Sequence, residues 1–302
     1  MKKRRIAVLY GGWSGERPIS LKSGAAVRRA LKRLGVPHAG IDVSPRVADE
    51  LRKKKIDLAF LAVHGPFGED GTLQGLLDIM GIAYTGCGVR ASAVCMHKPT
   101  AKKLFRAAGL ATPEGFVVTD PAALFPHDRP TPLPWVVKPA SQGSALGVTF
   151  VRAPSDWAGA MAAAFKADRE ALVEEAVSGT EITVGLLGDR ALPVVEIVPE
   201  HAFYDFHSKY AKGGSRHIVP ARLPDSVQRE ASRIALAAFR AVGGRHFARA
   251  DLMVDSAGKP WLLELNTLPG MTDVSLLPDA ARAAGISFDE LVINMLSMAV
   301  GG

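Results

Sequence analysis

Short apolar runs alternate with longer helical patterns along the first hundred residues. The runs at 6–10 and 57–63 predict buried strands, and a third short strand begins at 82–84. The patterns at 20–34 and 72–80, which follow the first two runs, predict helices. Alternation of strands with helices is typical of a parallel sheet. The pattern therefore predicts an N-terminal parallel α/β domain.

Two glycine-rich loops, at 11–17 and 64–71, follow the first two of these strands. In a parallel sheet, ligand-binding loops lie at the carboxyl ends of the strands, which favours a binding role for both loops. Neither loop has the spacing G-x-G-x-x-G, so the sequence does not support a dinucleotide-binding fold.

The pattern changes beyond the first hundred residues. Residues 98–179 begin with a predicted helix at 98–108 and continue as short strands and turns. The remainder is rich in strands, with helices expected at 226–241 and 279–300. Three modules fit this order better than one, and we place them at 1–97, 98–179 and 180–302. The predicted fold class is α/β, with an α+β arrangement in the last two modules.

Two apolar runs around a turn at 255–258 predict a β-hairpin that carries polar residues. Side chains alternate between faces along a strand, so Arg249 and Asp251 share a face, as do Glu264 and Asn266. If the two faces coincide, three oxygen ligands converge beside one arginine. Such ligands suit Mg²⁺ or Mn²⁺, which often hold phosphates as well. The alternative is a hairpin whose polar face simply meets solvent.

A small-residue loop at 140–147 joins a strand at 135–138 to a second strand at 148–151. A Walker loop would pass from a strand into a helix, so this is not one. A loop rich in glycine and serine can instead fold over phosphates and donate its backbone N–H groups. Alternation would bury Lys138, which then needs an anion, and a phosphate would serve. The alternative is a lysine that reaches the surface.

The strand at 172–177 contains two acids, Glu174 and Glu175, shortly before Ser178 and Gly179. Such a segment can present backbone groups to an adenine edge and a carboxylate to ribose hydroxyls. Solvated glutamates at a strand end are the alternative.

Composition narrows the class of protein. The chain has 302 residues, 48% of them hydrophobic, and no apolar run long enough for a transmembrane helix. The apolar run after the basic N-terminus is too short for a signal peptide, and there are two cysteines, so we expect a reducing cytoplasm. The net charge of +7 is scattered in small clusters, which argues against a nucleic-acid-binding protein.

Taken together, these segments resemble the D-alanine–D-alanine ligases of the ATP-grasp superfamily. The resemblance covers nearly the whole chain in order. Its motifs are the loop at 11–17, the segments 64–75 and 84–86, Lys138-Pro139, Gly143-Ser144, the segment 203–206 with Lys209-Tyr210, the segment 249–251 and the segment 264–272. Phe67 departs from the pattern, because the family often has glycine there.

The resemblance implies an activity and a fold. In this family ATP phosphorylates the carboxylate of one D-alanine, and the amine of a second D-alanine attacks the acyl phosphate. The implied fold is a parallel N-terminal domain followed by a two-lobed ATP-grasp part. The resemblance also implies ATP as co-substrate, two Mg²⁺ or Mn²⁺ ions, a homodimer, and a role in peptidoglycan precursor synthesis. No membrane or nucleic-acid partner is expected.

The resemblance also implies roles for single residues. Glu16 would anchor the ammonium of the first D-alanine with His64 nearby, and a Glu16–Ser144–Tyr210 hydrogen-bonded triad would tie the modules together. Arg249 and the N–H of Gly270 would stabilise the oxyanion of the tetrahedral intermediate. The other implied roles are nucleotide binding for Lys98, Lys138, Ser144, Glu174, Glu175, Val177, Glu181 and Lys209, metal binding for Asp251, Glu264 and Asn266, and binding of the second D-alanine's carboxylate for Ser275 and Leu276.

Two alternatives stay open at this point. A related ligase could use D-lactate or D-serine as the acceptor, although the context of Lys209 and Tyr210 favours the dipeptide-forming type. A non-catalytic nucleotide-binding protein on the same fold is the other alternative, and the presence of Arg249, Asp251, Glu264 and Asn266 argues against it.

Overall fold

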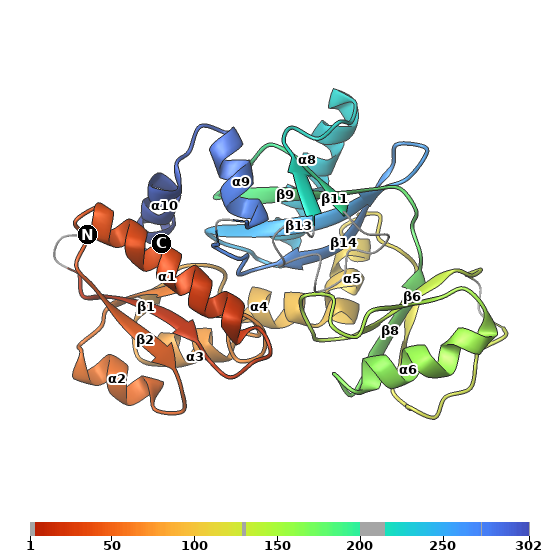
Figure 1. Cartoon of the computed structure of the whole chain (residues 1–302), viewed down its shortest axis with the longest axis horizontal. Coiled ribbons are helices and arrows are strands. Elements are labelled where there is room, and N and C mark those ends of the chain that lie inside the picture. Colours follow the sequence, from red (N-terminus) through yellow and green to blue (C-terminus); the bar gives the residue numbers. More distant parts are fainter. Residues whose placement is uncertain (1–3, 129–130, 200–214, 273, 302) are drawn as a thin grey trace.

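The computed structural model describes residues 4–128, 131–199, 215–272 and 274–301. It contains three sheets, each in a different part of the chain. Figure 1 shows the N-terminal domain and the central lobe at opposite ends of the molecule, with the C-terminal lobe lying against both. The three sheets follow the order of the three predicted modules, while the module boundaries themselves stay predictions.

The N-terminal sheet is parallel throughout, as predicted. Its strand order is β2 (His38–Val43), β1 (Ile6–Gly11), β3 (Leu58–Leu61) and β4 (Ala83–Tyr84). β1 and β3 are nearly continuous apolar runs because the middle of a parallel sheet is covered on both faces. The connecting helices are α1 (Arg17–Arg33), α2 (Val47–Lys53) and α3 (Thr72–Ile79). The sequence pattern had not identified β2 or α2.

The central lobe is an antiparallel sheet in the order β5 (Gly115–Val118), β8 (Ala171–Glu175), β6 (Trp135–Pro139) and β7 (Thr149–Val151). One helix, α6 (Trp157–Phe165), packs on it after a short 3₁₀ turn, η1 (Pro154–Asp156). The expectation of only strands and turns after the first helix of this module is wrong for α6. Trp157 and Met161 of α6 bury against Trp135 and Val173 of the sheet.

The C-terminal lobe has the largest sheet, in which all pairings are antiparallel. Its order is β12 (Ser215–Ile218), β11 (Val195–Pro199), β9 (Thr180–Leu187), β13 (Phe247–Val254) and β14 (Pro260–Asn266), with β10 (Arg190–Ala191) paired to β9. Alternate residues of β9 and β13 join a core with α8 (Asp225–Ala241), α4 (Val89–Met96) and α5 (Lys98–Ala107). Thr183, Arg249 and Asp251 therefore lie on the opposite face, which is the face of the site.

The chain ends in two helices, α9 (Leu276–Ala283) and α10 (Phe288–Gly301), rather than the single helical stretch expected from the sequence. The chain turns between them at Gly285, whose φ of 78° lies in the left-handed region. α10 returns to the N-terminal domain beside α1 (Figure 1), where Asp289 pairs with Arg33 at 2.5 Å.

Within the part of the chain that the structure describes, no single helix is long and apolar enough to cross a membrane. The α9–α10 pair passes such a test by length and composition, but the two helices are bent by 104° and contribute to a shared core with β1 and β3.

Candidate active site

Two adjoining cavities lie where the three sheets meet. The larger, about 480 Å³, is lined by β6, β8 and the C-terminal sheet, and the smaller, about 80 Å³, reaches the N-terminal domain. Lys98, Ser144, Glu181, Asp251 and Glu264 are among the residues that line both cavities. The shared residues make the two cavities parts of one site.

The larger cavity gathers the residues that the sequence assigned to the nucleotide. All of those that the structure describes line it, namely Lys98, Lys138, Ser144, Glu174, Glu175, Val177 and Glu181. Lys209 lies outside the described residues. Sequence reasoning had not identified Phe150, Met253 or Leu263, whose apolar side chains also line this cavity.

The smaller cavity gathers the residues assigned to amino-acid binding, catalysis and metal binding. Its lining includes Glu16, His64, Ser144, Arg249, Gly270, Ser275, Leu276, Asp251, Glu264 and Asn266. Tyr210, the third member of the expected triad, lies outside the described residues.

The predicted hairpin forms as β13 and β14, and its two polar faces coincide. Arg249 pairs in register with Asn266, and Asp251 with Glu264, before a bulge that follows Asp251. The Arg249 guanidinium donates to both oxygens of Asp251, at 2.9 and 2.7 Å. Thr183 donates from Oγ1 to the same carboxylate at 2.6 Å. The alternative of a solvent-facing hairpin is wrong, since Asp251 is only 6% exposed.

The donor set of the hairpin fits a hard divalent cation, because it offers two carboxylates and one amide oxygen. Asp251 is paired with Arg249, and the Nζ of Lys98 lies 3.4 Å from Oε2 of Glu264. Among the described residues, no group of three or more His, Cys, Asp or Glu side chains could hold a metal. The expected set has only two such side chains, since Asn266 is the third ligand, so metal binding stays a proposal.

Glu16 and Ser144 meet across the boundary between the N-terminal domain and the central lobe. Glu16 precedes the first turn of α1, is 5% exposed, and accepts a hydrogen bond from the hydroxyl of Ser144. A Cβ at Gly65 would lie 2.8 Å from the Glu16 carboxylate, so glycine leaves room for it there. Ser144 has a φ of 55°, a conformation that L side chains rarely adopt. This half of the expected triad is therefore formed.

His64 is buried among polar partners. Its Nε2 lies 3.1 Å from Oγ of Ser23, and its Nδ1 lies 3.4 Å from Oε1 of Glu69. Burial acts to lower the pKa of His64, but the hydrogen bond and charge of Glu69, with the charge of Glu16, outweigh it and raise the pKa. The sequence analysis assigned no role to Glu69, although Glu69 follows His64 by five residues in the same glycine-rich loop.

The segment before α9 completes the smaller cavity. Ser23 accepts a hydrogen bond from the N–H of Met271 at 3.2 Å, which anchors this segment to α1. Ser275 precedes the first turn of α9, and its hydroxyl accepts the N–H of Thr272 at 2.9 Å. Helix N-termini attract carboxylates through their unpaired N–H groups, which suits the expected role of Ser275 and Leu276.

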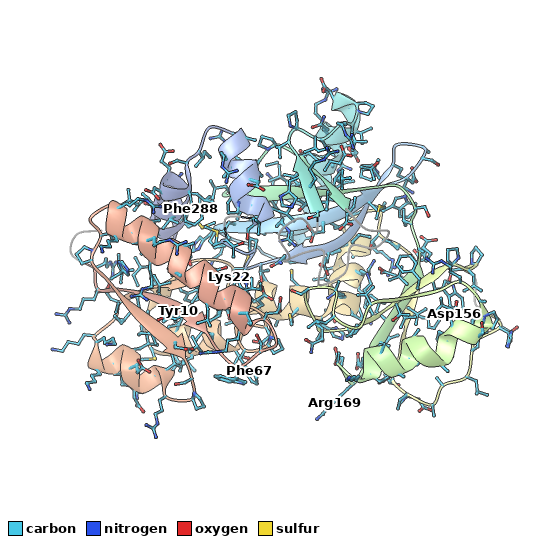
Figure 2. All side chains as sticks on the ribbon, viewed as in Figure 1. Tyr10, Lys22, Phe67, Asp156, Arg169 and Phe288 are labelled. Carbon is cyan, nitrogen blue, oxygen red and sulfur yellow. The ribbon has the colours of Figure 1, made fainter. Side chains whose placement is uncertain are left out.

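Phe67 occupies its loop with a φ of 67°, the left-handed conformation that glycine adopts readily. Its ring lies 5.0 Å from that of Trp13, and both rings are about half exposed. The pair adds an apolar wall to the two glycine-rich loops. Figure 2 shows Phe67 at the end of the N-terminal domain that faces the central lobe.

The anion that pairs with Lys138 in this structure is a side chain of the protein itself, Glu174. Val136 pairs in register with Glu174 across β6 and β8, so Lys138 lies diagonally opposite Glu174 on the same face, and the two side chains form an ion pair. A second lysine, Lys102, lies 2.6 Å from the other oxygen of Glu174. The predicted contacts of Lys138 with a phosphate and of Glu174 with the ribose stay predictions, and the structure adds an ion pair between the two side chains. Lys102 had not been singled out.

Comparison with known proteins identifies the family. The models for the N-terminus and the C-terminus of D-ala D-ala ligase match residues 37–87 and 105–297. The chain is 49% identical to the D-alanine–D-alanine ligase of Geotalea uraniireducens, over 99% of this chain and 96% of the relative. It is 46% identical to that of Citrifermentans bemidjiense, over 99% and 97%.

A solved structure gives the same result in three dimensions. The crystal structure of D-alanine–D-alanine ligase from Bacillus anthracis complexed with ATP superimposes with a TM-score of 0.86. It is 32% identical and covers 98% of this chain and 97% of its own. The chain therefore belongs to the D-alanine–D-alanine ligase family.

Proposed function

We propose that this protein is an ATP-dependent ligase that joins two D-alanines into D-alanyl-D-alanine. This is the reaction after which its relatives are named. The observation that carries the proposal is the junction of the two cavities at Asp251 and Glu264. A nucleotide in the larger cavity would direct its phosphates toward an amino acid in the smaller one. The expected peptidoglycan role, the cytoplasmic location and the homodimer belong to the same proposal.

The larger cavity would hold ATP. The B. anthracis relative is described as complexed with ATP, and the apolar side chains of Phe150, Met253 and Leu263 suit the faces of an adenine ring. Lys98 and Lys138 supply ammonium groups for the phosphates from α5 and β6. The N–H groups of the 140–147 loop would donate to the same phosphates.

Asp251, Glu264 and Asn266 would hold two Mg²⁺ or Mn²⁺ ions. Bound there, the ions would neutralise charge on the phosphates as the γ-phosphoryl group is transferred. Lys98, which now faces Glu264, would be free to contact phosphate oxygens once a cation balances that carboxylate.

The smaller cavity would hold the two amino acids. Glu16 would bind the ammonium of the first D-alanine, whose carboxylate takes the γ-phosphoryl group of ATP as the bond to ADP breaks. The amine of the second D-alanine, bound through Ser275 and Leu276, would then attack the acyl carbon. Arg249 and the N–H of Gly270 would stabilise the oxyanion until phosphate leaves.

The decisive experiment is an assay of purified protein with Mg²⁺-ATP, measuring ADP release and the mass of the product, with D-alanine, L-alanine or no amino acid. We expect stoichiometric ADP and D-alanyl-D-alanine with D-alanine, and neither with L-alanine. ATP turnover without formation of the dipeptide would indicate that the enzyme uses another acceptor, such as D-lactate or D-serine. Absence of turnover with every acceptor would support the non-catalytic alternative.

A further inference from the structure

Helix α5 presents two lysines on one face, one turn apart. Lys98 lines both cavities, whereas Lys102 lies behind the cavity wall and is 2% exposed. Lys102 donates to Oγ1 of Thr112 at 2.7 Å and contacts Glu174 at 2.6 Å. In Figure 1, α5 lies beside β14 and next to the central lobe. The contact with Glu174 places Lys102 against β8.

The carboxylate of Glu174 contacts two lysines, Lys138 and Lys102. Lys138 contacts Oε1 of Glu174 from the cavity side, and Lys102 contacts Oε2 from the buried side. Glu174 is 2% exposed, while the side chain of Lys138 is 12% exposed and lines the larger cavity. Two ammoniums and one carboxylate leave the group with one excess positive charge, which faces the cavity through Lys138.

The pKa shifts of Lys102 and Glu174 support a net positive charge on this group at neutral pH. Burial lowers the pKa of Lys102 to about 8, although the charge of Glu174 acts in the opposite direction. Burial acts to raise the pKa of Glu174, but the charges of Lys102 and Lys138 outweigh it, and the net shift is downward. Lys102 and Glu174 are therefore both largely ionised near pH 7.

We infer that Lys102 is a positioning residue that holds Glu174 when a nucleotide phosphate takes the ammonium of Lys138. The inference rests on the proposed function, because it assumes that the larger cavity binds ATP. A buried carboxylate that loses its counter-ion is strongly destabilised. With Lys102 in place, Glu174 keeps a partner and Lys138 can turn to phosphate. Without Lys102, binding of the phosphate would leave Glu174 unpaired.

The experiment compares Lys102→Met with Lys102→Arg, which keeps the charge. Calorimetric titration with Mg²⁺-ADP and with Mg²⁺-ATP measures affinity, the dipeptide assay gives KM for ATP and kcat, and thermal unfolding checks the fold. We expect Lys102→Met to weaken nucleotide binding and raise KM for ATP by about tenfold or more, because Lys138 stays on Glu174. Lys102→Arg should bind nucleotide nearly as well as the wild type.

A second substitution separates this role from a structural one. Glu174→Gln removes the charge that Lys102 balances, so Lys138 is released whether or not Lys102 is present. Nucleotide affinity in Lys102→Met/Glu174→Gln should therefore exceed that of Lys102→Met alone. If Lys102→Met does not fold, Lys102→Gln takes its place in both comparisons.

Unchanged nucleotide affinity in a folded Lys102→Met would overturn the inference. So would a double variant that binds no better than Lys102→Met, since loss of packing would not be reversed by removing a charge. The binding titration needs no dipeptide formation. A wild-type protein that binds nucleotide but makes no dipeptide would therefore contradict the proposed function and leave this inference standing.

Discussion

The imidazole of His64 is buried, yet its pKa is raised above its ordinary value of 6.5 because Glu69 lies beside it. Replacing Glu69 by glutamine removes that charge, and burial, which lowers the pKa of His64, then has the largest effect on it. We expect Glu69→Gln to move the pKa of His64 below 6.5, measured by NMR titration of the imidazole protons. Asp49→Asn, which neutralises an exposed carboxylate on α2, serves as the control and should leave the pKa unchanged.

The same shift makes stability depend on pH. A pKa raised on folding contributes stability that is complete below the unfolded value of 6.5 and is lost as pH rises through the folded pKa. Denaturant unfolding of the wild type should therefore show this contribution decline above pH 6.5, and Glu69→Gln should lack the decline. A parallel pH dependence in the two proteins would show that Glu69 does not set the charge of His64.

Glu264 offers a test of the metal site by a change of one atom. Glu264→Gln preserves the size of the side chain but replaces one carboxylate oxygen by an NH₂ group, and so removes the charge that would face a divalent cation and that now faces Lys98. We expect dipeptide formation at limiting Mg²⁺ to fall by at least about tenfold, or roughly 1.4 kcal/mol of barrier, with partial recovery at high Mg²⁺. Glu230→Gln on the surface of α8 is the matched neutralisation. Near-normal turnover at limiting Mg²⁺ would contradict the ligand assignment.

At the scale of elements, the sequence predicted the helices and strands in which apolar and polar residues follow a regular pattern. β1, β3 and the β13–β14 hairpin are short apolar runs or alternating runs beside turn residues. The α6 helix was missed because its nine residues are nearly all alanine or large apolar residues, without a polar face to reveal the helical period. The turn between α9 and α10 rests on Gly285, which a helical pattern alone does not distinguish from an interior glycine.

Gly24 positions α1, the helix that follows Glu16. A Cβ at Gly24 would lie 2.5 Å from Cβ of Tyr10 on β1, so Gly24→Ala must push the helix from the sheet. We expect a loss of about 1–3 kcal/mol in the free energy of unfolding and weaker binding of D-alanine. Gly159 of α6 has open space at its Cβ position, so Gly159→Ala should instead stabilise by about 0.5–1 kcal/mol. Chemical denaturation measures both, and destabilisation of equal size in the two variants would argue against the contact with Tyr10.

At the scale of the whole molecule, the site depends on contacts between distant segments. The resemblance supplied Glu16 and Lys98, the hairpin pattern supplied Glu264, and the structure places all three around adjoining cavities. The pairing of Lys138 with Glu174, and the presence of Lys102 behind them, could not be inferred in the same way. Which anion a buried lysine meets is decided here by the pairing of β6 with β8 and by the contact of Lys102 with Glu174, and no local pattern records these contacts.

The contact of Glu16 with Ser144 joins segments that are 128 residues apart, and it links the N-terminal domain to the central lobe. Ser144→Ala removes a hydrogen bond to a buried carboxylate, which is worth about 1.5–3 kcal/mol. We expect kcat/KM for D-alanine to fall by roughly tenfold or more and amide hydrogen exchange to accelerate in the 140–147 loop.

Ala145→Gly is the matched control, because Ala145 has the same φ of 55° but no hydroxyl. Glycine accepts that conformation more readily, so this variant should keep its kcat/KM even if its loop exchanges faster. If Ser144→Ala and Ala145→Gly lose kcat/KM equally, flexibility of the loop explains the loss. A loss confined to Ser144→Ala assigns it to the hydrogen bond. In a Glu16→Gln background, the further loss caused by Ser144→Ala should then be smaller than in the wild type, since the two residues share one contact between the domains.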